Sequence, residues 1–305
     1  MAKKRWFSIA LQLKGSVIPE ILPRTLVCTA FGTSISIFYG YGFAVSLPIL
    51  AGLIPNIVLG LLLVFRTNTA YERFWEGRKA WGSLMNTVRN LARQIWVAVL
   101  ERELEDRENK IRAVRLLPAF AVAMKLHLRH ESVSTELAGL IASEQFEKLK
   151  SMNHPALEIA FWISDYLQQQ HEKGCLNTHQ LIAMNELLNF MVDALGACER
   201  IQKTPMPLAY NIHLKQLLLI YCLSLPFQMV AGLEWLTGPV VGLISFTLLG
   251  IEEIGIEIED PFGRDPNDLP LDAICTNMQR NINDLIALSP TQRISPQVSR
   301  SSFED

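Results

Sequence analysis

Cysteines are few in this chain, and none stands where it could serve a structural site. The five, at positions 28, 175, 198, 222 and 275, are far apart, odd in number and without C-x-x-C spacing. A disulfide framework needs paired cysteines in a small chain, and a zinc site needs closely spaced ligands. The sequence therefore predicts neither.

Motifs that carry catalytic chemistry in many enzymes are also missing. The chain has no P-loop, no G-x-G-x-x-G, no G-x-S-x-G and no H-E-x-x-H, so no phosphate cradle, nucleophile turn or zinc-binding helix is indicated. Basic residues are scattered and the formal net charge is −2, which gives no field for nucleic acid. We expect a protein that is not an enzyme, has no resident cofactor and binds no nucleic acid.

Charge itself is missing from a long stretch near the N-terminus. The range Thr25–Phe65 runs 41 residues without Asp, Glu, Lys, Arg or His. Because a helix needs ~20 apolar residues to cross a bilayer, the stretch predicts two crossings folded as a hairpin over residues 25–66. The run Tyr39–Gly42 is typical of an interfacial turn, and Pro48 suits the start of the second helix, residues 48–66.

A second uncharged region lies nearer the C-terminus. Gln216–Leu233 has 18 uncharged residues and Trp235–Ile251 has 17, with only Glu234 between them, which predicts a second hairpin within residues 208–258. Lysines and arginines flank the hairpins but are absent from their turns, so the positive-inside rule places both turns outside and both termini in the cytoplasm. Residues 1–24, basic and amphipathic, are expected along the membrane surface.

The middle of the chain has the pattern of water-soluble helices. Between positions 71 and 100, apolar residues recur at alternating spacings of three and four, as in a helix packed on other helices; they are Trp81, Leu84, Val88, Leu91, Ile95 and Ala98. No strand pattern follows. We predict an all-α protein with four transmembrane helices in two hairpins, a cytosolic helical bundle over residues 67–207 and a cytosolic C-terminal segment over residues 259–305.

Two segments resemble one known family. The run from Ile57 to Gly82 is similar to the second transmembrane helix and cytosolic extension of the bestrophin family, near its prokaryotic branch. The run from Ile258 to Asp272, IEDPFGRDPNDLPLD, resembles the element after that family's last transmembrane helix. The resemblance implies a homopentamer embedded in membrane lipid, in a bacterial plasma membrane or a thylakoid-type membrane.

One face of the second span is the predicted pore surface. Ile57, Leu61 and Phe65 are spaced i, i+4, i+8 and share a helical face. Spacing alone also allows this face to contact lipid or a neighbouring helix. The family resemblance implies that the three residues of five subunits form a hydrophobic neck, which would favour weakly hydrated ions and could close by dewetting.

Neighbouring residues are candidates for the rest of the pathway. Arg66 follows the last predicted ring, and guanidinium groups there would attract anions; the alternative is snorkelling to lipid phosphate. Thr67 and Asn68 would line a wider vestibule. The resemblance also implies a lower cytosolic aperture at Leu188, or at Met184 one turn earlier, although apolar residues on a bundle helix equally suit its core.

An acidic run near the C-terminus is the candidate metal site. In animal bestrophins the matching region binds Ca²⁺, which takes six to eight oxygen ligands. Asp260, Asp265 and Asp268 occupy the matching places here, but Arg264 and Pro266 stand where the animal pattern has acids. The alternative to a calcium site is a structural turn that caps the following helix.

Together these features predict a passive channel that conducts chloride and other monovalent anions. A cation-selective channel of the same fold is an alternative, since the family includes both kinds. Two alternatives belong to other classes: a membrane metal enzyme that uses the carboxylates of Glu253, Glu257 and Asp260, and a non-conducting scaffold that presents its cytosolic helices to partners.

Overall fold

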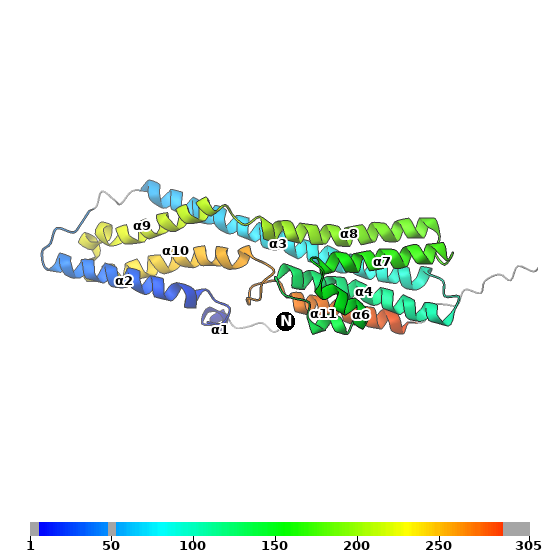
Figure 1. The fold of residues 1–305 in the computed structure, drawn as a ribbon. Helices are drawn as coiled ribbons and strands as arrows, with labels where there is room; N and C mark the ends of the chain where they lie inside the picture. Colours follow the sequence, from blue (N-terminus) through cyan, green and yellow to red (C-terminus); the bar gives the residue numbers. More distant parts are fainter. Residues whose placement is uncertain (1–5, 48–52, 289–305) are drawn as a thin grey trace, which may run out of the picture. The chain divides into compact units, whose positions relative to one another are not determined.

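The computed structural model describes residues 6–47 and 53–288, and within these ranges every regular element is helical. The elements in chain order (Figure 1) are α1 (Trp6–Ala10), α2 (Ile18–Gly40), α3 (Leu53–Ala98), α4 (Leu104–Leu128), α5 (Thr135–Ala138), α6 (Ser143–Lys150), α7 (Pro155–Glu172), α8 (Thr178–Lys203), α9 (Leu208–Leu233), the 3-10 helix η2 (Glu234–Leu236), α10 (Thr237–Glu259) and α11 (Leu271–Ala287). The predicted all-α class is confirmed for the described part of the chain.

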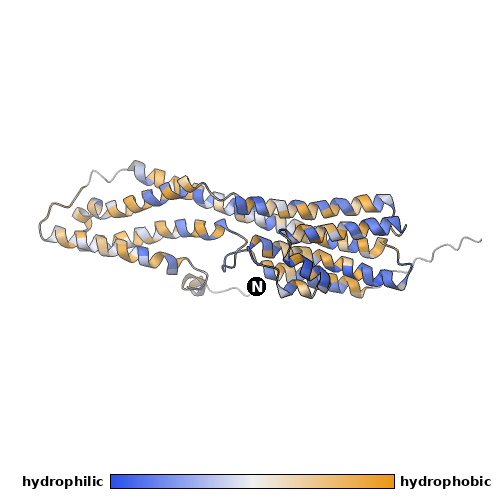
Figure 2. Cartoon of the chain, in the orientation of Figure 1, coloured by the Kyte–Doolittle hydropathy of each residue, from blue (hydrophilic) through white to orange (hydrophobic). Residues whose placement is uncertain are grey.

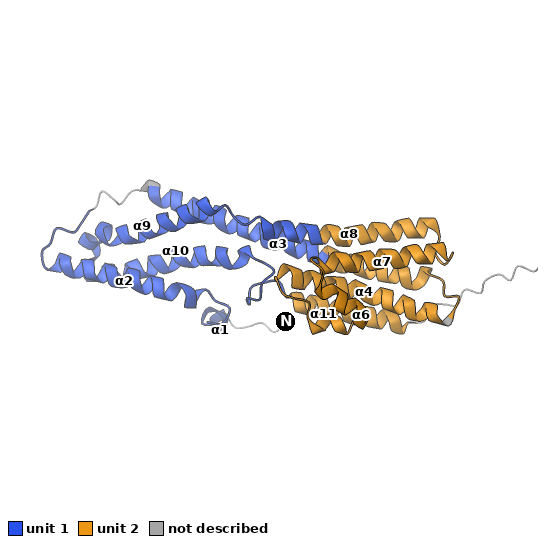
Figure 3. Cartoon of the chain, in the orientation of Figure 1, with its two compact units in different colours: residues 1–82, 195–270 blue, residues 83–194, 271–305 orange. Residues whose placement is uncertain are grey.

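The chain divides into two compact units (Figure 3). Unit 1 comprises residues 1–82 and 195–270, and unit 2 comprises residues 83–194 and 271–305. The long helices α3 and α8 are divided between the units: each has one part in unit 1 and the other part in unit 2. Unit 1 holds both predicted hairpins.

The first hairpin turns where the sequence predicts. Helix α2 ends at Gly40, the amide of Tyr41 donates to the carbonyl of Ile37 at 3.1 Å, and Gly42 has a φ of +85° that favours glycine. The predicted helix start at Pro48 lies outside the described residues. From Leu53 the second arm continues as one helix of 46 residues, so the span and its extension are a single element.

The second hairpin breaks at Glu234, the single charged residue between Gln216 and Ile251. Glu234 separates α9 from α10 and has a φ of +46°. Its carbonyl accepts hydrogen bonds from the Ser36 and Thr237 hydroxyls at 2.7 and 2.6 Å. The Thr237 amide also donates to this carbonyl, so the carbonyl at the helix break is fully satisfied.

Helices α2 and α10 pack closely because small residues line their contact. Helix α9 contacts both of them, and Figure 2 shows hydrophobic residues along all three. A Cβ atom added at Gly238 would overlap Thr33, and one added at Gly242 would overlap Thr29. Glycines four residues apart let helix backbones approach in this way in membranes.

Three described stretches are long and apolar enough to cross a membrane: Ile18–Gly40, Leu208–Glu259 and Thr178–Lys203. The first two coincide with predicted spans. The third is α8, which the sequence pattern predicts to belong to the cytosolic bundle. Helix α8 buries a single stripe that includes Met184, Leu188, Met191, Leu195 and Cys198, and exposes Glu186 and Asp193 on another face, as an amphipathic bundle helix does.

Unit 2 is a helical bundle with a buried charge in it. Helix α4 packs against α7 and α11. Its Lys125 is 1% exposed and donates to Glu136 at 2.5 Å and to Asp272 at 2.7 Å. Arg129 donates to the same Asp272 at 3.1 Å. A buried ammonium group is tolerated because carboxylates surround it.

Candidate functional site

The face of α3 that carries Ile57, Leu61 and Phe65 is exposed in the subunit. These side chains are 51, 52 and 61% exposed. Because each helical residue turns by about 100°, Leu59 and Leu63 point to the other side, and they are only 4 and 3% exposed. A continuous apolar stripe is thus presented outward.

The opposite face of α3 is fixed by α9. Leu59 and Leu63 pack with Leu214 and Leu218 in one buried cluster. The hydroxyl of Tyr210, on α9, also donates to the carbonyl of Leu62 at 2.9 Å. Packing on one side therefore determines which side chains of α3 face outward.

Arg66 lies inside the subunit and does not project from the exposed stripe. It is 2% exposed; its Nη2 atom lies 2.6 Å from Oε2 of Glu259, and its Nη1 atom lies 2.5 Å from the sulfur of Met206. The side chain also crosses Gly255, where an added Cβ would lie 3.3 Å from its Cγ atom. The expected free guanidinium group at the pore mouth is replaced by an internal ion pair.

Glu259 and Arg73 are structural partners that the sequence analysis did not identify. Glu259 also accepts from the amide of Met206 at 2.8 Å. Arg73, two turns after Arg66, donates to the carbonyls of Glu259 at 3.1 Å, Ile201 at 2.7 Å and Thr204. The two arginines of α3 therefore hold the end of α10 and the end of α8. The seven-residue spacing of the arginines was the available signal for a shared face.

The two predicted vestibule residues differ in their surroundings. Thr67 is half-buried, and its hydroxyl donates to the carbonyl of Leu63 at 2.8 Å. Asn68 is exposed. Of the pair, only Asn68 presents its polar side chain freely to the surface.

The residues predicted for a lower aperture are buried. Met184 is 1% exposed and Leu188 is 5% exposed, both on the buried stripe of α8. The reason is the 3.6-residue period, which places them with Met191 and Leu195. In this subunit they are buried with the core residues of α8, and an aperture at these positions stays a prediction.

The acidic run forms a turn. Asp260 accepts the amide of Phe262 at 3.3 Å, and Asp268 accepts the amide of Asp265 at 2.7 Å. Among the residues that the structure describes, the oxygens of Asp260, Asp265 and Asp268 do not gather within 4.8 Å of one another. Carboxylates that accept main-chain N–H groups and stand apart do not fit the oxygen cage that calcium needs.

The carboxylates of the proposed metal-enzyme alternative also have separate partners. Glu253 pairs with Arg24 at 2.8 Å, and Glu257 accepts from Asn267 at 2.5 Å. Asp260 belongs to the turn. The three groups therefore do not form one catalytic cluster.

These features define a helical integral membrane protein that presents an apolar face on its second long helix. The sequence model of the bacterial and fungal bestrophin family matches residues 1–284, and the chain belongs to that family.

Relatives and solved structures agree with this assignment. A Nostoc sp. protein named as a voltage-dependent anion channel-forming protein is 65% identical over 293 residues, which are 96% of this chain and 95% of the relative. A protein of the same name from Synechocystis sp. is 56% identical over 95% of this chain and 94% of its own. The crystal structure of a bacterial bestrophin homologue from Klebsiella pneumoniae has a TM-score of 0.80 at 30% identity, covering 89% of this chain and 99% of that one.

Proposed function

We propose that several copies of this chain form a passive channel for chloride and other monovalent anions, with the Ile57, Leu61 and Phe65 faces turned to a shared axis. The observation that carries the proposal is the division of α3 into one face packed on α9 and one exposed apolar face. The names of the Nostoc and Synechocystis relatives support anion conduction. No catalytic role is part of this proposal.

Assembly is part of the proposal because the exposed Ile57, Leu61 and Phe65 face can enclose an axis only when several copies meet. The proposed assembly is a homopentamer surrounded by lipid, as the family resemblance implies. Native mass spectrometry of the detergent-solubilised protein would show five subunits, and a monomer under conditions that preserve flux would contradict the assembly.

Discrimination among anions in this proposal comes from the neck. The charge of Arg66 is compensated by Glu259 within the subunit, so a bare guanidinium ring is not invoked. Apolar rings require partial dehydration of the ion. Weakly hydrated anions such as iodide or nitrate should therefore pass more easily than chloride.

The decisive test is the reversal potential of the purified protein in a planar bilayer under a potassium chloride gradient. An anion channel gives a value near the chloride equilibrium potential. A value near the potassium potential would support the cation-selective alternative, and a folded protein without current would support the scaffold.

The neck is tested by truncation. Replacing Ile57, Leu61 and Phe65 together by alanine should widen the rings and raise conductance severalfold. Leu59→Ala with Leu63→Ala is the matched control on the packed face. It should lower stability by about 2–5 kcal/mol per buried leucine without raising conductance.

The proposed membrane arrangement places both termini and residues 67–207 in the cytoplasm of a bacterium, at the plasma membrane or a thylakoid-type membrane. Helix α1 exposes Trp6 and Phe7 by 72 and 73%, which suits an interfacial position. A reporter fused to the C-terminus should be active only on the cytoplasmic side.

A further inference from the structure

The loop that follows α10 is held by a main-chain hydrogen bond and by buried side chains. Within residues 260–270 the amide of Leu269 donates to the carbonyl of Pro261 at 3.0 Å. Phe262 and Leu269 are 1 and 3% exposed. The Phe262 ring lies so close to α3 that a Cβ added at Gly77 would be 3.0 Å from it. The loop is therefore anchored on the helix that carries the proposed pore face.

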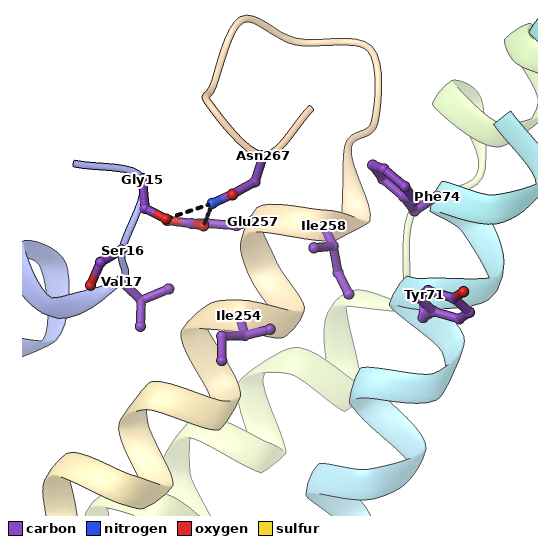
Figure 4. A pocket seen from close by; sticks show the side chains of 9 residues that line it. All are labelled: Gly15, Ser16, Val17, Tyr71, Phe74, Ile254, Glu257, Ile258 and Asn267. Carbon is purple, nitrogen blue, oxygen red and sulfur yellow. Dashed lines mark hydrogen bonds between the residues drawn. The ribbon is translucent and has the colours of Figure 1, made fainter. Parts of the chain in front are cut away.

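Asn267 projects from this loop and bridges two other segments (Figure 4). Its Nδ2 atom lies 3.3 Å from the carbonyl oxygen of Gly15 and 2.5 Å from Oε2 of Glu257. Gly15 precedes α2 and has a φ of +77°, and a Cβ there would lie 3.4 Å from Pro266. The three groups border a hollow of about 480 Å³ that is otherwise mostly apolar.

The side-chain amide of Asn267 lies between two electronegative oxygens. A carboxylate and a carbonyl oxygen that lie close together repel each other, so N–H donors placed between them are favourable. An amide nitrogen carries two N–H donors and can give one to each oxygen. Calcium takes six to eight oxygen ligands, whereas Asn267 turns its Nδ2 atom, and not its Oδ1 atom, toward the two oxygens.

We propose that the side chain of Asn267 takes the place of a bound cation in a clasp that joins Gly15 to Glu257. The N-terminal segment is thereby tied to the loop anchored on α3 without a metal ion.

Replacing Asn267 by aspartate tests the proposal directly. Two carboxylates would then meet, so the thermal midpoint should fall by about 2–4 °C in chelator, and millimolar calcium should restore it. The wild type should show no calcium-dependent shift. Asn267→Leu should lose the same stability and gain no calcium response.

A matched control separates the clasp from a general effect of charge. Asn90 is exposed on α3, and Asn90→Asp should leave the midpoint unchanged with or without calcium. A calcium-dependent shift in the wild type would overturn the proposal, as would an aspartate variant at position 267 that behaves like the control.

Hydrogen exchange gives a local measurement. Amides of residues 15–18 should exchange at least tenfold faster in Asn267→Leu than in the wild type, while those of α9 stay unchanged. Equal exchange in the two proteins would show that the amide does not hold the N-terminal segment.

The effect on conduction rests on the proposed function. If α3 lines the pore, Asn267→Asp should make chloride flux calcium-dependent. If the exchange and thermal data support the clasp but neither the wild type nor Asn267→Asp conducts, the channel proposal fails and the clasp proposal is retained. If flux is normal and calcium-independent in both proteins while the midpoint does not move, the clasp fails and the channel stands.

Discussion

Oε2 of Glu259 lies 2.6 Å from Nη2 of Arg66, and the arginine is almost completely buried. The pair joins the end of α10 to α3 immediately after the exposed apolar stripe. A buried charge of this kind depends on its partner. The contact therefore locks the orientation of α3 that the channel proposal requires.

Removal of one member of this pair should lower the stability of the folded protein. Glu259→Gln leaves the guanidinium group buried without a counter-charge, and the free energy of unfolding should fall by about 3–5 kcal/mol. Denaturant unfolding in mild detergent measures it. The double variant Arg66→Met with Glu259→Gln should lose much less than the two single variants summed; an additive loss would show that the residues act independently.

The same pair should contribute little to ion selectivity. Because the two charges cancel within the subunit, the double variant should keep the wild-type reversal potential to within a few millivolts. A large shift toward the cation equilibrium potential would show that Arg66 acts on the permeating ion.

Acid stability should depend on Asp272 in unit 2. The hydrogen bond from Lys125, which outweighs burial, and a second bond from Arg129 hold the pKa of Asp272 below its usual 3.8. A carboxyl group with a lowered folded-state pKa stabilises the protein above the unfolded value, and this contribution is lost as pH falls through the folded value. Asp272→Asn should lower the thermal midpoint at neutral pH. On acidification, the midpoint of this variant should fall less than that of the wild type. Parallel curves for variant and wild type would refute this assignment.

The close contact of α2 and α10 should not tolerate a side chain. In Gly242→Ala the new Cβ meets the Thr29 hydroxyl, so the yield of folded protein and its thermal midpoint should drop. Gly232→Ala is the control, because an added Cβ at that helical position meets no atom within 4 Å. An equal drop in yield and thermal midpoint in both variants would mean that the loss of helix flexibility, and not the α2–α10 contact, causes the destabilisation.

Local signals explain what could be predicted from the sequence. The breaks after Gly40 and at Glu234 follow from glycine and charge in otherwise uncharged runs. The division of α3 into Leu59 and Leu63 on one side and Ile57 and Leu61 on the other follows from the helical period.

Long-range pairing explains what could not be predicted. Arg66 and Glu259 are 193 residues apart, and nothing near Arg66 distinguishes a buried pair from an exposed ring. Asn267 likewise bonds to Gly15, 252 residues away. Met184 and Leu188 were ambiguous because apolar residues at helical spacing suit a core and an aperture equally.

The most direct test of the pore assignment uses a single introduced thiol. The five native cysteines are buried, so the wild type should resist a negatively charged, membrane-impermeant thiosulfonate. Leu61→Cys should react and lose most of its chloride current, because position 61 would meet water in the pore. Leu219→Cys, on an exposed apolar position of α9 at 59%, is the lipid-facing control and should keep its current. If Leu61→Cys behaves like Leu219→Cys, the α3 face does not line the pathway.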